Sequence, residues 1–210
     1  MTVSVGGKRL LLYMTGIVVF VAMLIFIPSF VCRPHDPKLD DFGVVPPFQL
    51  VDETGQPFTE AALRGHPTIV HFVFTRCDTI CPVTTMKLAN IQEKTFDVGK
   101  DLKLVSFSVD PEYDTPERLA AYARAHHADD TRWHFLTGPA ATIHQLVEGP
   151  FMGSMKYEGT LPSGAPSIGH SGRFFLLDQD LHIRGSYDSG DINRLDDLMH
   201  DARYLVRVGR

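Results

Sequence analysis

The chain has 210 residues, of which 44% are hydrophobic and 21% charged, and this ordinary globular composition fits one domain with an appendage. Its formal net charge is −5, and because Lys8 and Arg9 lie near the N-terminus, residues 33–210 hold 18 basic and 25 acidic side chains. Such an acidic surface argues against nucleic acid as a partner.

The first predicted element is a transmembrane helix. From Leu10 to Val31 the sequence is almost entirely apolar and uncharged, close to the ~20 residues that a helix needs to cross ~30 Å of hydrocarbon. Lys8 and Arg9 precede it, so the positive-inside rule places the N-terminus in the cytoplasm. We therefore expect residues 1–32 to be a cytoplasmic start and a single-pass anchor in the inner membrane, with everything after Cys32 in the periplasm or otherwise outside the cytoplasm.

A cleaved signal peptide is the alternative for this segment. Its apolar region is normally ~7 to 15 residues long and ends in small residues, whereas Phe30 and Val31 are bulky. The same bulk argues against lipid modification of Cys32. Residues 33–46, rich in proline, are predicted to be a short stiff tether, and residues 47–210 the exported domain.

The first half of the domain alternates between strands and a helix. Thr68 to Phe74 is a continuous β-branched and aromatic run, typical of a strand buried on both faces. The other predicted elements here are a strand at Phe48–Asp52, a turn containing Gly55, a return strand at Pro57–Phe58, a helix from Pro82 to Phe96 and a strand from Leu102 to Val109.

The second half continues with Thr115 as the cap of a helix that begins at Pro116. There follow a strand at Trp133–Leu136, a helix at Ala140–Glu148, a hairpin of Arg173–Leu177 and His182–Tyr187, and a final helix at Asp191–Val206. This order predicts an α/β fold with a central sheet covered by helices on both faces.

Cys77 and Cys81 are the most informative residues, because they directly follow the buried strand Thr68–Phe74. In such folds, reactive groups gather at the carboxyl ends of strands. If Cys81 lies in a helix, Cys77 is one turn away on the same face, which permits a disulfide or shared ligation of one soft metal ion. A purely structural disulfide would close only a tiny loop. A redox dithiol is a stronger alternative, since Arg76 and a nearby helix N-terminus should lower the pKa of Cys77.

Three blocks of sequence then narrow the choice. They are Thr75–Pro82 (Thr-Arg-Cys-Asp-Thr-Ile-Cys-Pro), Ser108–Pro111 followed by Asp114–Pro116, and His170 ahead of Phe174–Asp178. In order and spacing these blocks resemble the Sco/SenC family of membrane-anchored copper proteins, over essentially the whole exported domain. The resemblance implies a thioredoxin-like fold and one copper ion, Cu(I) or Cu(II), held by Cys77, Cys81 and His170.

The chemistry of these ligands agrees with that implication. Two thiolates favour Cu(I), and an added imidazole suits copper in either oxidation state, whereas structural zinc usually takes four protein ligands and the exported domain has no third cysteine. Many family members have an acidic residue immediately before the histidine, where this chain has Gly169, so an outer-shell contact to the imidazole is expected to differ. Met152 and Met155 either meet Cu(I) or pack in their loop.

Four other residues have plainer interpretations. His71 falls within the buried strand and is interpreted as a core histidine. His126 and His127 end a helix, where the dipole favours a cation. Asp110 ends a strand and should lie near the cysteines, where it either turns the chain or holds a neighbouring group.

The resemblance implies a copper metallochaperone that assists copper insertion into the CuA centre of cytochrome c oxidase. Its partners would be the copper-bearing subunit of that oxidase and other copper carriers or thiol reductants. The alternative is a thiol–disulfide oxidoreductase that keeps the recipient's cysteines reduced, and both roles require the reduced dithiol. Whether the chain is an enzyme stays open between them. A peroxidase is a third hypothesis, from Cys81-Pro82 and Phe48–Asp52, but Asp78 stands where peroxiredoxins place a threonine, and its charge would raise a thiol's pKa.

Overall fold

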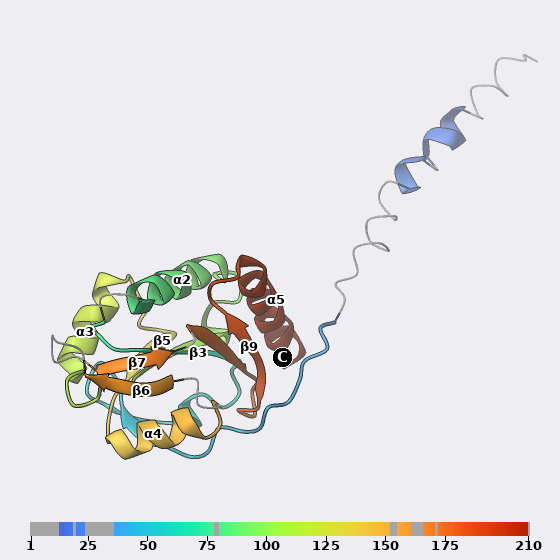
Figure 1. Cartoon of the computed structure of the whole chain (residues 1–210). Helices are drawn as coiled ribbons and strands as arrows, with labels where there is room; N and C mark the ends of the chain where they lie inside the picture. Colours follow the sequence, from blue (N-terminus) through green and yellow to red (C-terminus); the bar gives the residue numbers. More distant parts are fainter. Residues whose placement is uncertain are drawn as a thin grey trace, which may run out of the picture. The chain divides into compact units, whose positions relative to one another are not determined.

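The computed structural model describes residues 13–18, 20–23, 36–77, 80–151, 155–160, 166–170 and 172–209. The chain divides into two compact units, Met1–Pro37 and Lys38–Arg210. In the first unit, residues 13–18 and 20–23 are helical (Figure 1). No helix within the described ranges is both long and apolar enough to cross a bilayer. The rest of the predicted anchor, Cys32 and the start of the predicted tether lie outside the described residues.

A five-stranded sheet forms the centre of the second unit. Its order is β5 (Trp133–Leu136), β4 (Lys103–Ser108), β3 (Thr68–Val73), β8 (Arg173–Leu177) and β9 (Ile183–Asp188). The first three strands are parallel, and β8 is antiparallel to both β3 and β9. The carboxyl ends of β3 and β4 and the beginning of β8 therefore lie at one edge of the sheet, which we call the upper edge.

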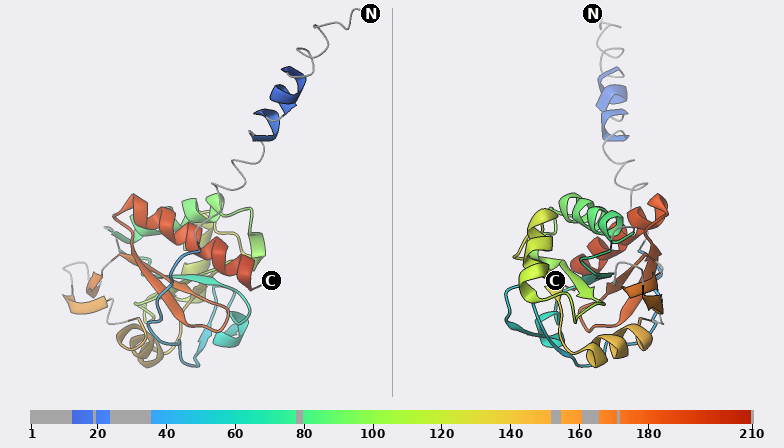
Figure 2. Two further views of the ribbon diagram at one scale, coloured as in Figure 1. Left: turned by 90° about the vertical axis from the view of Figure 1, so that its right-hand side faces the viewer. Right: turned by 60° about the vertical axis from the view of Figure 1, so that its left-hand side comes forward.

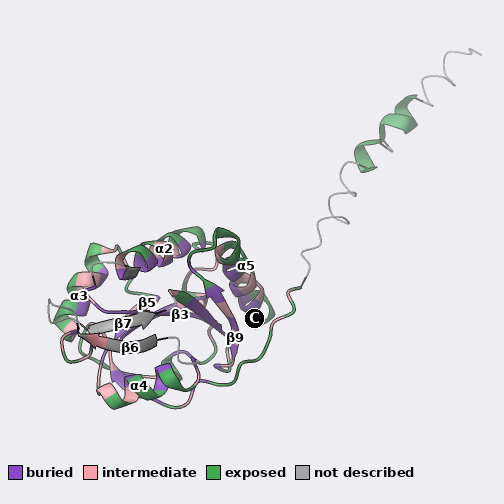
Figure 3. Cartoon of the chain, in the orientation of Figure 1, coloured by how far each residue is buried: buried purple, intermediate pink, exposed green. Residues whose placement is uncertain are grey.

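Helices cover both faces of this sheet (Figures 1 and 3). Along β3, Ile69 and Val73 belong to one buried cluster and Val70 to the other, because side chains alternate along a strand. The first cluster includes residues of α2 (Ile80–Lys94), α3 (Pro116–Ala125) and α5 (Ile192–Val208). The second includes residues of α4 (Ala140–Glu148) and of the hairpin β1 (Gln49–Val51) and β2 (Pro57–Thr59). The predicted thioredoxin-like α/β architecture is confirmed.

The structure differs from the sequence prediction in several places. Helix α2 begins at Ile80 rather than at Pro82 and ends at Lys94, so Cys81 lies inside its first turn. The segment predicted as loop before β8 contains an antiparallel pair, β6 (Met155–Thr160) and β7 (Pro166–His170), which projects from the side of the domain in the left view of Figure 2. Short, glycine-containing strands without alternating hydrophobicity give little sequence signal. The short 3-10 turns Glu60–Ala62 and Gly99–Asp101 were also not predicted.

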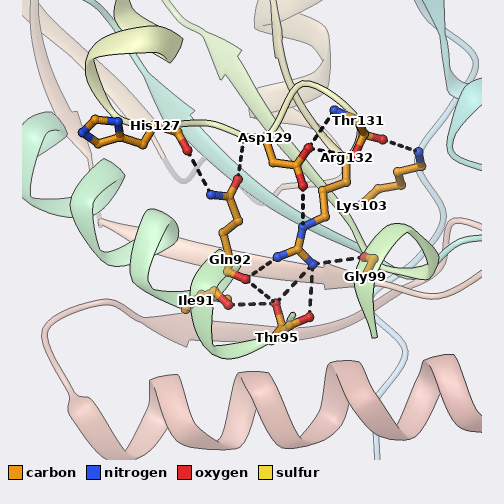
Figure 4. A network of polar contacts seen from close by, with 9 residues as sticks. All are labelled: Ile91, Gln92, Thr95, Gly99, Lys103, His127, Asp129, Thr131 and Arg132. Atoms are coloured by element: carbon orange, nitrogen blue, oxygen red, sulfur yellow. Dashed lines mark hydrogen bonds and ion pairs between the residues drawn. The ribbon is translucent and has the colours of Figure 1, made fainter. Parts of the chain in front are cut away.

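The far end of α2 is held by the buried side chain of Arg132 (Figure 4). Its guanidinium donates to the backbone carbonyls of Thr95 (3.2 Å), Gly99 (3.0 Å) and Gln92. These carbonyls lie at the C-terminal end of α2 and just after it, where helix carbonyls have no partner within the helix. Because Arg132 directly precedes β5, it fixes the helix that carries Cys81 to the sheet.

The described part of the predicted tether packs along β9. The amide of Phe42 donates to the carbonyl of Ile183 (2.9 Å) and the amide of Ile183 donates to the carbonyl of Gly43 (2.8 Å). The Asp41 carboxylate contacts His182 (3.0 Å) and Arg184 (3.4 Å). Residues 41–45 thus extend the domain rather than acting as a separate spacer.

Candidate functional site

Cys77 and Cys81 lie at the upper edge, on either side of the passage from β3 into α2. Cys77 follows the end of β3 by four residues, and its amide donates to the carbonyl of Phe74 (3.2 Å) in a tight turn. Cys81 lies in the first turn of α2, where the hydroxyl of Thr84 donates to its carbonyl (3.1 Å). Both side chains are largely buried, with 9% of Cys77 and 2% of Cys81 exposed. The slightly greater exposure makes Cys77 the more accessible sulfur.

The two sulfurs are close enough to influence each other's ionisation. A hydrogen bond with the Cys77 side chain, then burial, then the charge of Cys77 raise the pKa of the Cys81 thiol, while a backbone hydrogen bond with Phe74 opposes them. The second thiolate is therefore harder to form than the first. The side-chain hydrogen bond also means that the two thiols are close enough to share a metal ion or to form a disulfide.

A buried carboxylate holds the segment that leads to Cys77. The backbone amide of Thr75 donates to Asp114 (3.1 Å), and the hydroxyl of Thr75 donates to it as well (2.5 Å). The hydroxyl of Ser108, the last residue of β4, donates to Asp114 at 2.6 Å. Burial raises the pKa of Asp114, and the hydrogen bonds from Ser108 and Thr75 act in the opposite direction.

A second carboxylate holds the next residue. The Arg76 guanidinium pairs with Asp110 at 2.5 Å and lies 4.5 Å from the ring centre of Tyr113, which also carries Arg118 at 3.8 Å. The hydrogen bond with Asp110 raises the pKa of Arg76 above its ordinary value. As the sequence indicated, Asp110 lies near the cysteines, and it holds a neighbouring group.

Beneath the first two turns of α2 lies a buried chain of polar side chains. Trp133 donates its indole N–H to Ser106 (2.9 Å), and Ser106 contacts Nδ1 of His71 (2.9 Å). Nε2 of His71 lies 3.5 Å from the hydroxyl of Thr85, which contacts Tyr122 at 3.0 Å. Burial, with smaller effects of the nearby cysteine charges, raises the pKa of Tyr122 to about 12. His71 is therefore a core histidine, as predicted.

His170 is the last residue of β7 and pairs with Met155 of β6. The structure describes the backbone of His170 but not its imidazole. The side chains of Met152 and Met155 also lie outside the described residues. The chain enters β8 three residues later, at Arg173, and β8 runs antiparallel to β3. The topology therefore brings the backbone of His170 toward the upper edge, where Cys77 lies. Among the side chains that are described, no group of three His, Cys, Asp or Glu residues is arranged to hold a metal ion.

Sequence reasoning assigned no role to several residues of this site. Thr75 and Asp114 belong to the motif blocks without a predicted role of their own, and Tyr122 and Thr85 belong to none of the blocks. One signal was available: Thr75 follows one parallel strand and Asp114 follows the next, so both must lie at the same edge of the sheet. The contact between Thr85 and Tyr122 required the packing of α3 against α2, which no local pattern specifies.

The fold and the site together define a thioredoxin-like protein with a dithiol at the beginning of a helix and at the carboxyl end of a central strand. The family model described as SCO1/SenC matches residues 37–206. The chain therefore belongs to the SCO1/SenC family, as the three sequence blocks indicated.

Individual relatives agree with this assignment. The chain is 30% identical over 160 residues to "SCO1 protein homolog" of Bacillus subtilis. The matched residues cover 76% of this chain and 81% of that protein. It superposes on BsSco, described as a member of the Sco family of cytochrome c oxidase assembly proteins, with a TM-score of 0.69 and 28% identity over 84% of this chain and 99% of that one. The copper-bound ScoI of Arabidopsis thaliana gives a TM-score of 0.66 and 28% identity over 77% and 99% of the two chains.

Proposed function

We propose that this protein is a membrane-anchored copper metallochaperone that binds one copper ion through Cys77, Cys81 and His170. Copper is its cargo, and the recipient is the copper-bearing subunit of cytochrome c oxidase, at the CuA centre. The observation that carries the proposal is the pair of buried cysteines at the edge of the sheet, whose side chains are hydrogen-bonded to each other, in a family with a copper-bound member.

The site suits a carrier for physical reasons. Thiolates are soft ligands that favour Cu(I), and an imidazole extends the set to Cu(II). Both cysteines are largely buried, so their immediate surroundings are apolar, yet Cys77 keeps some exposure through which a recipient's ligand can approach. A three-ligand site leaves the ion open to exchange, which transfer to another protein requires.

We also propose that residues 1–32 anchor the chain in the inner membrane, with the domain in the periplasm. Support comes from the apolar run Leu10–Val31 and from Lys8 and Arg9 before it. The acidic domain would then meet other copper carriers and thiol reductants outside the cytoplasm. Fractionation of cells, followed by protease treatment of spheroplasts, tests this: the domain should be degraded in spheroplasts and protected in intact cells.

Copper titration of the full-length protein in detergent tests the site. Wild type should bind one equivalent of copper, Cys77→Ala and Cys81→Ala should lose binding of both oxidation states, and His170→Ala should lose Cu(II). His144→Ala serves as the matched control, because His144 lies on α4, on the opposite face of the sheet from α2. If His170→Ala keeps both oxidation states with unchanged stoichiometry and spectrum, the three-ligand site is wrong.

A thiol–disulfide reductase is the second candidate, and the contact between the two cysteine side chains favours it as well. In that role Cys77 attacks a disulfide of the recipient, the recipient's leaving thiolate takes up a proton, and Cys81 then displaces the recipient's second sulfur to leave a Cys77–Cys81 disulfide. Such activity should survive in His170→Ala and disappear in Cys77→Ala. Reduction of an oxidised recipient, followed with both variants in the absence of copper, separates the two roles.

A further inference from the structure

The two cysteines are positioned by different parts of the fold. Cys81 belongs to α2, whose far end is fixed to β5 through the buried Arg132. Cys77 lies before that helix, in the segment that leaves β3. The distance between the sulfurs therefore depends on what holds this segment in place.

Asp114 binds that segment through its backbone as well as through a side chain. Both donors of Thr75, its backbone amide and its hydroxyl, bind the Asp114 carboxylate, and Thr75 lies two residues before Cys77. The other side of the carboxylate accepts from Ser108 at the end of β4. Asp114 thus joins the ends of two neighbouring strands and ties the start of the cysteine segment to the sheet.

This arrangement is unfavourable for stability taken alone. Asp114 is fully buried, and its partners Thr75 and Ser108 are neutral. Burying an ionised carboxylate costs free energy, and no opposite charge among those partners offsets that cost. Strained or costly groups of this kind concentrate at functional sites. The carboxylate's advantage is geometric, since two oxygens can accept from an amide and two hydroxyls at once.

We propose that Asp114 is a positioning residue. By accepting hydrogen bonds from Thr75, it holds Cys77 at the distance from Cys81 that copper ligation needs. The inference rests on the proposed function, because it assumes that the two thiols share copper. Asp114 itself does not touch the metal.

The test compares copper affinity across variants of the full-length protein in detergent, by competition with a chelator of known affinity. Asp114→Ala should bind copper about 10- to 100-fold more weakly, which is the usual effect of losing a residue that orients metal ligands. Asp114→Asn should keep most of the affinity, since the amide oxygen accepts from Thr75 and the amide nitrogen donates to Ser108. Rescue by asparagine distinguishes positioning from an effect of the charge.

Asp178 provides a matched control. It is also buried, and its carboxylate accepts from the amides of Asp180 and His182, both at 2.9 Å, and pairs with Arg184. It directly follows β8, so it lies at the edge of the sheet opposite to Cys77. Asp178→Ala should reduce stability and leave copper affinity at the wild-type value.

A second pair of variants serves if Asp114→Ala does not fold. Thr75→Val deletes only the hydroxyl that donates to Asp114 and should weaken copper binding. Thr68→Val deletes a comparable hydroxyl, which donates to the carbonyl of His66 (3.1 Å) at the opposite end of β3, and should not.

Several outcomes would overturn the inference. They are wild-type affinity in Asp114→Ala or in Thr75→Val, an equal loss in Asp178→Ala, and a loss in Asp114→Asn as large as in Asp114→Ala. A failure of the proposed function looks different, because wild type itself would then bind no copper, or Cys77→Ala would bind it as wild type does.

Discussion

At the scale of single residues, Asp114 shows how a group at the site affects the stability of the whole domain. Burial raises the pKa of its carboxyl, so the folded state favours the protonated form. For a group with a raised folded pKa, the contribution to stability is complete below the unfolded pKa and is lost as the pH rises through the folded pKa. At a pH above the ordinary pKa of aspartate, Asp114 therefore contributes less to stability than it does in acid.

Asp114→Asn should accordingly be at least as stable as wild type at pH 7, and its advantage should disappear as the pH falls toward ~4, the ordinary pKa of aspartate. Urea unfolding followed by the fluorescence of Trp133, the only tryptophan and fully buried, measures this. An advantage that stays constant with pH would show that titration of this carboxyl has no part in it.

At the scale of elements, the end of α2 is held by two arginines in different surroundings. Arg132 is buried and donates to three backbone carbonyls. Arg203 is 37% exposed at its side chain and contacts Asp97 (3.0 Å) and the carbonyl of Lys94 (2.5 Å). The two replacements remove similar chemical groups, so burial should decide the difference between them.

Arg132→Met should lower the free energy of unfolding by about 1.5 to 3 kcal/mol, because hydrogen bonds of a buried charged donor are lost and carbonyls are left buried. Arg203→Met should lower it by about 0 to 1 kcal/mol, the usual range for exposed ion pairs. Urea unfolding of both variants checks the order. Equal losses would contradict this account of how α2 is held.

The segment before β1 gives a pH-dependent prediction. The pKa of Asp41 is lowered, first by the backbone amide of Gly43 and then by His182. A lowered folded pKa means that the contribution to stability is present above the ordinary pKa of aspartate and is lost as the pH falls through the folded value. The packing of residues 41–45 against β9 should therefore become less stable at acidic pH.

Asp41→Asn should reproduce that weakening at neutral pH. The amides of Phe42 and Val45 donate to the carbonyls of Ile183 and Leu181. Both should exchange with deuterium faster in the variant, while amides of β3 should not change. Hydrogen exchange read by mass spectrometry resolves the two segments. Unchanged protection of residues 41–45 would mean that the backbone pairing alone holds them.

At the scale of the whole molecule, the sequence predicted the sheet and its helices because their patterns are strong. The run Thr68–Val73 and the spacing of Leu198, Met199, Ala202 and Leu205 each specify an element and its buried face. The motif blocks also predicted the family. Their ligand assignment to Cys77, Cys81 and His170 stays a prediction.

Other features depend on contacts between residues distant in the chain, and no local pattern encodes them. The hydrogen bonds between Thr75 and Asp114 join residues 39 positions apart. The polar chain from Trp133 to Tyr122 links three strands with two helices. The β6–β7 pair lacks the alternation of a half-buried strand, so no strand was predicted there. The sequence is thus more informative about elements than about what joins them.

Copper binding should couple the site to global stability in a way that tests all three ligands together. A ligand that binds only the folded state raises the free energy of unfolding by about 2.7 kcal/mol at a concentration 100 times its dissociation constant. Cys77 and Cys81 are close in sequence and can still bind copper when the chain is unfolded, which reduces this gain. His170 is distant in sequence, so only the folded chain can add it to the pair.

The shift in thermal unfolding on adding copper should therefore be largest in wild type, smaller in His170→Ala and absent when both cysteines are replaced by alanine. The fluorescence of Trp133 follows unfolding in all three proteins, and measurements at several copper concentrations separate affinity from intrinsic stability. An equal shift in wild type and in His170→Ala would mean that folding brings no third ligand to the thiols. In that case the dithiol alone would carry the chemistry, and the reductase role would become the better account of the protein.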